Sequence, residues 1–207
     1  MQEARLSTRD LACRRGDRVL FRGLSLALKP GEALHVTGAN GVGKSSLLRL
    51  LAGLARPFAG SVERAGMVGL LDERPALDPE APLGRALGFW SRIDGDAPCR
   101  LAELGLADLL DVPVRYLSTG QRKRAAMARL LGQSAAVWLL DEPLNGLDRD
   151  AAALFERLVG EHRKAGGIAV IASHQPFAGE RLGQLPLSNY ALPDYSLSDS
   201  SLPDQVA

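Results

Sequence analysis

The chain has 207 residues, 46% of them hydrophobic, and a formal net charge of +1 from 25 Lys and Arg against 24 Asp and Glu. This length favours one domain with a sizeable core, and the near-neutral charge gives no general attraction to nucleic acid, so we expect no nucleic-acid partner. Cys13 and Cys99 have neither metal-ligand spacing nor a secretory signal before them, which favours a reducing intracellular compartment. No stretch is apolar enough to cross a bilayer, so work at a membrane would require other, membrane-spanning subunits.

The first recognisable element alternates apolar with small or polar residues from Leu24 to Lys29. This period of two is typical of a half-buried antiparallel strand, and Pro30-Gly31 then marks a turn. The N-terminal section is therefore predicted to form an antiparallel β-layer that precedes the core of the domain.

A glycine-rich loop follows the apolar run Ala33–Val36 and precedes a leucine-rich stretch, as strand, loop and helix. It fits the phosphate-binding pattern G-x-x-x-x-G-K-[ST], in which backbone N–H groups and the N-terminus of the next helix converge on a polyphosphate. Lys44 can neutralise the β and γ phosphates, and the Ser45 hydroxyl can ligate Mg²⁺. The predicted ATP-binding residues are Gly38, Ala39, Asn40, Gly41, Val42, Gly43, Lys44 and Ser45.

Helical spacing continues beyond the loop and again in the middle of the chain. Four leucines after Ser45 are predicted to be core, and Arg56-Pro57 ends that helix. Prolines punctuate residues 66–117, where 83–93 and 99–110 have helix-like apolar spacing and no strand-like runs. We therefore predict a helical subdomain inserted at about 76–135. The four leucines are Leu47, Leu48, Leu51 and Leu54.

A further helix is predicted to start at Ser118, because Ser118 and Gln121 have the S-x-x-Q spacing of a capping box. Its first turn carries Arg122, Lys123 and Arg124. Cations are disfavoured at a helix N-terminus unless they are solvated or meet an anion, so this end is a candidate for presentation to phosphate. A solvated basic face is the alternative interpretation.

Two short apolar runs, at 137–140 and 168–171, flank a helical stretch at 150–164, which predicts a parallel sheet covered on both faces. Asp141 and Glu142 follow the first run, where the carboxyl ends of parallel strands line a ligand crevice. Because successive side chains on a strand point to opposite faces, we expect the two acids to differ in role, one acting on Mg²⁺ and the other orienting a water. Pro143 is expected to keep Glu142 extended.

His174 comes just after the second run, near the same crevice, whereas His35 and His162 are expected to be structural. The predicted domain spans 1–176. Residues 177–207 are rich in Leu, Ser, Pro and Asp without sustained periodicity, so we predict an irregular tail there, with packing on the domain left open.

Together these residues resemble the nucleotide-binding subunits of ATP-binding cassette (ABC) transporters, over Leu24 to Pro176. The resemblance implies an α/β P-loop ATPase with a parallel-sheet core, using ATP and Mg²⁺. Leu117–Gln121 is similar to that family's signature motif, Asn145–Asp148 to its D-loop and His174 to its switch histidine. In such proteins two cassettes pair head to tail. The implied catalytic residues are Lys44, Glu142 and His174, and the implied Mg²⁺ ligands are Ser45 and Asp141. The residues acting on the partner's ATP are Ser118, Gly120 and Asp148.

Within this family the motifs are most similar to the ATP-binding subunits of haem exporters for cytochrome c maturation, through 31–34, 37–48, 138–144 and 173–175. This implies an ATPase that drives haem export or the release of a haem-loaded chaperone, with membrane-spanning permease subunits and a second copy of the chain. It also implies a peripheral place on the cytoplasmic face of a bacterial inner membrane. The alternatives are another ABC exporter, for a lipid or a drug, a soluble non-transport ATPase, and an ATP-driven switch that releases a bound factor.

Three positions depart from the family pattern. Arg15 stands where an adenine-stacking aromatic is usual, and its planar guanidinium is an alternative cover for the base. Glu73-Arg74-Pro75 replaces the Q-loop glutamine, and Thr119 replaces a signature glycine. From these changes we expect a slower or partner-dependent ATPase.

Overall fold

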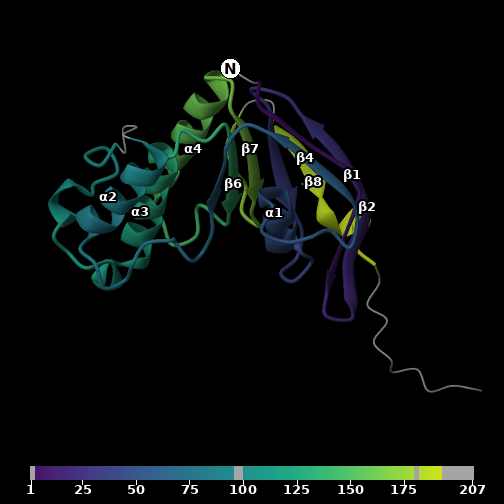
Figure 1. Ribbon diagram of the computed structural model, residues 1–207, viewed down its shortest axis with the longest axis horizontal. Coiled ribbons are helices and arrows are strands. Elements are labelled where there is room, and N and C mark those ends of the chain that lie inside the picture. The colour runs from purple at the N-terminus through teal and green to yellow at the C-terminus, as the bar shows by residue number, and fades with distance from the viewer. Residues whose placement is uncertain (1–2, 96–99, 180–181, 193–207) are drawn as a thin grey trace, which may run out of the picture.

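The computed structural model describes residues 3–95, 100–179 and 182–192, which together form an arch (Figure 1). Cys13 is buried, while Cys99 and the part of the predicted tail from 193 onward lie outside the described residues.

A five-stranded parallel sheet occupies the centre of the molecule and confirms the predicted core. Its strand order is β5-β6-β7-β3-β8, and every neighbouring pair is parallel. Because β3 is inserted beside β7, the strand that precedes the phosphate loop lies next to strands from the second half of the chain. The strands are β3 (Ala33–Thr37), β5 (Val68–Leu71), β6 (Val137–Asp141), β7 (Ile168–Ala172) and β8 (Leu182–Pro186).

Both faces of this sheet are buried, in two separate hydrophobic clusters. On β6, Trp138 and Leu140 join the cluster on the helical side, while Val137 and Leu139 join the cluster on the opposite side. Residues of β7 alternate in the same way. Alternate side chains of a strand point to opposite faces, so continuous apolar runs are what a sheet covered on both sides requires.

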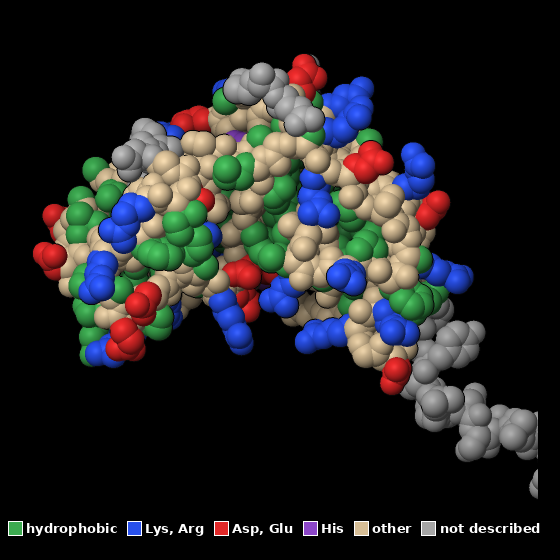
Figure 2. All heavy atoms as spheres, viewed as in Figure 1, with side chains coloured by type: hydrophobic (Ala, Val, Ile, Leu, Met, Phe, Trp, Pro, Cys, Tyr) green, Lys and Arg blue, Asp and Glu red, His purple; other side chains and the backbone are tan. Residues whose placement is uncertain are grey.

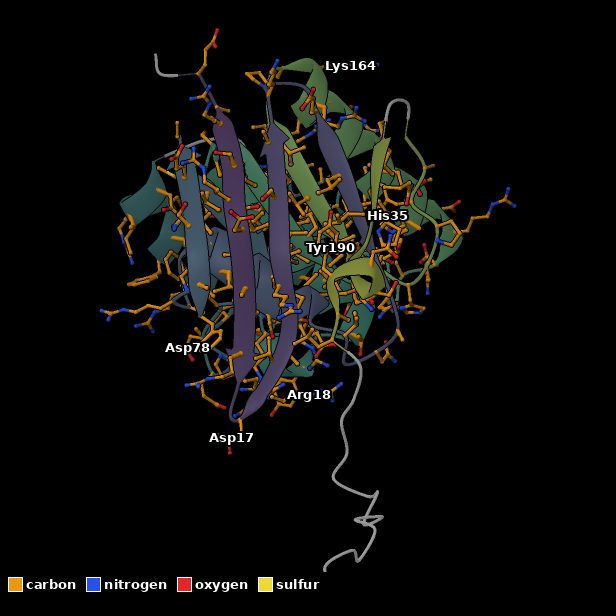
Figure 3. All side chains as sticks on the ribbon, turned by 90° about the vertical axis from the view of Figure 1, so that its right-hand side faces the viewer. Asp17, Arg18, His35, Asp78, Lys164 and Tyr190 are labelled. Atoms are coloured by element: carbon orange, nitrogen blue, oxygen red, sulfur yellow. The ribbon has the colours of Figure 1, made fainter. Side chains whose placement is uncertain are left out.

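A second sheet is antiparallel, in the order β2-β1-β4, and confirms the predicted β-layer. In Figure 3 its strands face the viewer, with Asp17 and Arg18 at the turn between β1 and β2. The strand β4 follows α1 in the chain, so the layer is not built from the N-terminal section alone. The helix α1 packs between the two sheets. The bounds are β1 (Arg5–Arg15), β2 (Arg18–Leu28), β4 (Ala59–Ala65) and α1 (Lys44–Ala52).

The inserted helices lie between β5 and β6 in sequence and form the arm of the arch that is remote from the antiparallel sheet (Figure 1). The helix predicted at 99–110 is wrong over its described part, which consists of turns and one short 3-10 helix. None of the described helices has the length and hydropathy to span a membrane. The helical elements are α2 (Leu83–Asp94), η1 (Ala107–Leu109), η2 (Val114–Tyr116), α3 (Thr119–Gly132) and, after β6, α4 (Arg149–Lys164).

Two other sequence predictions need correction. Leu54 is 69% exposed rather than core, because α1 ends at Ala52 and Gly53 turns the chain at a φ of 80°. The predicted irregular tail is wrong over Leu182–Tyr190, where β8 pairs with β3 and η3 (Leu187–Tyr190) packs beside β2. Only the fourth residue of β8, Leu185, is buried, so the edge strand carries almost no periodic signal.

Two histidines are structural, as predicted. His162 stacks on Trp138 with ring centroids 3.9 Å apart, and its Nε2 lies 3.2 Å from the Ile168 carbonyl oxygen. Burial lowers the pKa of His162 to about 4. His35 is also buried and its pKa is lowered by burial, with Nε2 3.3 Å from the Ser173 carbonyl oxygen. Both imidazole rings are therefore neutral in the folded protein.

We predict that His162→Phe reduces the loss of stability in mild acid. As the pH falls from 6.5 towards about 4, His162 binds a proton in the unfolded chain but not in the folded one, so folding is progressively disfavoured. The variant removes this contribution of His162, which lowers the free energy of unfolding by about 2 kcal/mol between pH 7 and pH 5. Urea unfolding of both proteins at the two pH values measures the free energy of unfolding. An equal drop between pH 7 and pH 5 in the variant and the wild type would contradict the assigned pKa.

Candidate active site

The carboxyl ends of β3, β6 and β7 meet at one edge of the parallel sheet and open onto a cavity of about 370 Å³. Figure 2 shows acidic side chains in the hollow under the arch, with basic side chains beside them. Ligands of α/β proteins bind at this edge, where the strand order changes direction. The cavity is lined by Arg15, Leu20, Asn40, Gly41, Gly43, Lys44, Ser45, Ser46, Glu73, Asp141, Glu142, Asn145 and His174.

The glycine loop joins β3 to α1 in a conformation that requires its glycines. Gly38 has a φ of 144°, and a Cβ there would lie 2.9 Å from the Val42 side chain. Gly43 precedes α1 with a φ of 113°, and a Cβ there would lie 3.2 Å from Phe21. No side chain caps α1, so the N–H groups of its first turn remain available to an anion in the cavity.

Lys44 is 7% exposed, and its ammonium group crosses back over the loop. Nζ donates to the Gly38 carbonyl oxygen at 2.8 Å and lies 3.8 Å from Oε1 of Glu142. The charge therefore sits beside the loop and the uncapped first turn of α1, and an anion bound there would meet both the ammonium and the N–H groups of that turn.

Asp141 ends β6 as a buried carboxylate. Burial raises its pKa, the hydrogen bond from the Ser45 hydroxyl lowers it, and the nearby charge of Glu142 raises it again. Its Oδ1 is fully buried and has no hydrogen-bond partner among the residues that the structure describes. A buried carboxylate oxygen without a donor is suited to a cation, and Mg²⁺ takes few protein ligands beside phosphate oxygens and water. The Asp141 and Ser45 pair therefore fits a nucleotide-bound Mg²⁺.

Glu142 follows with a φ of 45°, so the predicted extended conformation before Pro143 is wrong. Its N–H donates to the Ala172 carbonyl oxygen at 2.8 Å, and its own carbonyl oxygen accepts from Lys123 Nζ at 2.9 Å. These contacts hold a conformation that a non-glycine residue rarely adopts. Such outliers persist where the surroundings determine them, and they cluster at functional sites.

His174 lies two residues beyond β7 and contacts the same glutamate. Its Nδ1 is 3.0 Å from Oε2 of Glu142, so the Glu142 carboxylate lies between His174 on one oxygen and Lys44 on the other. The structure thus brings Lys44, Ser45, Asp141, Glu142 and His174 together, although they come from three segments of the chain. Arg15 and Glu73, at two of the positions that depart from the family pattern, line the same cavity.

The residues expected to act on a partner's nucleotide do not line this cavity. Ser118 caps α3 in the predicted capping box: its Oγ accepts from the Gln121 N–H at 3.2 Å, and the Gln121 side chain accepts from the Ser118 N–H at 2.8 Å. Asp148 caps α4 by accepting from the Ala151 N–H at 2.8 Å. A Cβ on Gly120 would lie 3.1 Å from the Gly146 carbonyl oxygen. As an acceptor, the Ser118 hydroxyl still has its own proton to donate.

Lys123 has a role that was not predicted from the sequence, where it was grouped with its basic neighbours as exposed to phosphate or solvent. Lys123 is 8% exposed and points at the Glu142 carbonyl, whereas Arg124 donates to the Leu104 carbonyl oxygen at 3.0 Å. The signal was present in the spacing: Lys123 is four residues before Met127 and seven before Leu130, and both are fully buried.

Comparisons with known proteins agree with this geometry. The ABC transporter family matches residues 21–145. The cytochrome c biogenesis ATP-binding export protein CcmA of Novosphingobium aromaticivorans is 60% identical over 92% of this chain and 99% of that protein. The protein of the same name from Zymomonas mobilis is 49% identical over 90% of this chain and 86% of its own length. A solved structure of cbiO1 from Clostridium perfringens, part of the ABC transporter complex cbiONQ, has a TM-score of 0.66 at 27% identity and covers 82% of this chain and 78% of cbiO1.

We predict that Lys44→Ala weakens ATP binding. The variant removes the ammonium beside the loop N–H groups, and a hydrogen bond to a charged group contributes about 1.5–3 kcal/mol, or about 10- to 150-fold in affinity. Titration calorimetry on the full chain measures the change. Lys164→Ala, at the exposed end of α4 (Figure 3), is the matched control and should bind as the wild type does. Equal affinities in both variants would contradict the assignment.

Proposed function

The chain belongs to the ABC transporter family of ATP-binding proteins, and on that basis we propose that it is the ATP-hydrolysing subunit of an export complex for cytochrome c biogenesis. In this proposal, ATP hydrolysis drives the export of haem or the release of a haem-loaded chaperone. The observation that carries it is the 60% identity to a cytochrome c biogenesis export protein over almost the whole of both chains. A phosphate loop, paired acids and a histidine around one cavity support the ATPase activity.

ABC ATP-binding proteins work with membrane permease subunits, and cbiO1 is likewise part of an ABC transporter complex, cbiONQ. We assign this chain to permease subunits of a cytochrome c maturation system, at the cytoplasmic face of a bacterial inner membrane. Two copies would pair head to tail, with Ser118, Gly120 and Asp148 of each copy facing the ATP of the other. The free hydroxyl proton of Ser118 at the start of α3 supports this role, because it can donate to a phosphate oxygen.

Binding of ATP begins with the loop and Lys44. The N–H groups of the loop and of the first turn of α1 receive the phosphate oxygens, and the Lys44 ammonium neutralises their charge. Ser45 and Asp141 would hold Mg²⁺, which supplies further charge neutralisation when it is bound with the nucleotide. Arg15 lines the same cavity and can cover the adenine with its guanidinium plane.

Glu142 is the proposed general base. Its carboxylate is 3.8 Å from Lys44 Nζ and 3.0 Å from His174 Nδ1, and it is only 12% exposed. When phosphate engages Lys44, the Oε1 oxygen loses its nearest cation and can accept a proton from an attacking water. His174 then orients the carboxylate through Oε2, or contacts the γ-phosphate itself from the same side of the cavity.

We predict that Glu142→Gln slows ATP hydrolysis at least about 10²-fold, because a neutral amide cannot take the proton from water. ATP affinity should change little, since Glu142 does not hold the phosphates. Single-turnover hydrolysis and an ATP titration separate the two effects. Glu63→Gln, on the exposed strand β4, should retain full turnover. Full activity of Glu142→Gln would remove the general-base assignment.

The cellular function is tested by deleting this chain from a bacterium that makes c-type cytochromes. The expected result is loss of covalently bound haem, with b-type cytochromes kept, and recovery with the wild-type chain but not with Lys44→Ala. Purification from detergent-extracted membranes should recover the chain with permease subunits. A deletion strain with normal c-type cytochromes would overturn the proposed pathway, and recovery as a lone dimer would favour a non-transport ATPase.

A further inference from the structure

We propose that Lys123 is a positioning residue that holds Glu142 in its active conformation from the helix α3. The two residues are 19 positions apart in the chain, and α3 contributes no residue to the cavity itself. This inference rests on the proposed role of Glu142 as general base, and it adds a residue that acts on the reaction only through that glutamate.

The contact is direct and buried. Lys123 is 8% exposed, and its Nζ donates to the main-chain carbonyl oxygen of Glu142 at 2.9 Å. A lysine is rarely buried to this extent without a specific partner. The only hydrogen bond that the structure gives to this ammonium, among the described residues, is the one to Glu142.

Glu142 needs such a contact because of its backbone. Its φ of 45° is strained for a residue with a side chain, and Pro143 further restricts it. The N–H is fixed by the Ala172 carbonyl oxygen at 2.8 Å, but within the described part of the chain the carbonyl has one donor besides Lys123, the Asn145 N–H at 3.3 Å. Without Lys123, rotation about the N–Cα bond of Glu142 can carry its carbonyl group, with Pro143 after it, towards a more relaxed φ. The carboxylate would then move away from His174 and from the water that it must orient.

The electrostatic surroundings strengthen this contact. Burial lowers the pKa of Lys123, while the charges of four nearby acids, Glu73, Asp141, Glu142 and Asp72, raise it. Hydrogen bonds from a charged donor are shorter and stronger than those between neutral groups. The Lys123 ammonium thus supplies a positive charge near these carboxylates, in addition to that of Lys44, as well as the bond to the carbonyl.

The test compares Lys123→Met with Arg124→Met in steady-state ATP hydrolysis and in an ATP titration, both on the full chain in its membrane complex. Methionine keeps the length of the lysine stem and removes the donor. We expect Lys123→Met to lower kcat about 10- to 100-fold, as misplaced catalytic groups do, and to leave ATP affinity within about twofold of wild type. Lys123→Arg, which keeps a charged donor, should restore most of kcat.

Arg124→Met is the matched control, because it also removes a bond from an α3 cation to a main-chain carbonyl, that of Leu104. Thermal unfolding of each variant establishes the folded fraction. Lys123→Leu, with a shorter side chain that cannot donate a hydrogen bond, gives the same readout if Lys123→Met does not fold. Equal losses of kcat in Lys123→Met and Arg124→Met, or a full kcat in Lys123→Met, would overturn the proposal.

A double variant shows whether Lys123 acts through Glu142. In the Glu142→Gln background, Lys123→Met should cause no further loss of kcat, because the base whose position it controls is already absent. Additive losses would overturn the proposal and leave the role of Glu142 intact. Full activity of Glu142→Gln alone would instead remove the proposed base and this inference together, so the two failures are distinguishable.

Discussion

The parallel register of β3, β7 and β6 is the constraint on which the site depends. Val36 is paired with Ala172, and Ala172 with Asp141, so the three strands end at the same height. The phosphate loop, the two acids and His174 therefore leave the sheet side by side. Because the side-chain period is two, a slip of one residue in β6 would turn Asp141 to the opposite face and remove its carboxylate from Ser45. Continuous burial of both faces makes such a slip costly.

This edge concentrates groups that do not favour folding. Lys44, Lys123 and Asp141 are all nearly buried, and burial raises the pKa of the Asp141 carboxyl and lowers that of the Lys123 ammonium. A buried charge is tolerated only when partners and hydrogen bonds compensate its desolvation, and Oδ1 of Asp141 lacks such a partner within residues 3–95, 100–179 and 182–192. The nucleotide and its metal would complete that compensation. The site therefore gives up stability in exchange for ligand binding, a trade common at active sites.

Much of the site was predictable because its signals are local. The phosphate loop, the acids after β6 and the histidine after β7 each lie within a few residues of an apolar strand. The errors concern features set by distant contacts. The φ of Glu142 depends on Ala172 and Lys123, which no local rule for a residue before proline contains. Likewise β8 forms because β3 offers a free edge, and not because residues 182–186 have a strand pattern of their own.

The contact between Lys123 and Glu142 would also connect two proposed roles of the chain: the contact of Ser118 with the other copy's ATP, and the action of Glu142 in its own cavity. Lys123 lies just over one helical turn from Ser118, which caps the same helix, so a displacement of the start of α3 moves the ammonium with it. In the proposed pair of chains, that start would face the ATP of the other copy. Contact of Ser118 with the phosphate bound by the other copy would therefore influence the position of Glu142 in the same chain as Ser118. The influence would pass through the helix α3 and the hydrogen bond from Lys123. A rigid helix is a physical link of the kind that coupling between sites requires, provided that it has two arrangements. The second arrangement would be the one in which Lys123 has released the Glu142 carbonyl, since the strained backbone of Glu142 could then relax.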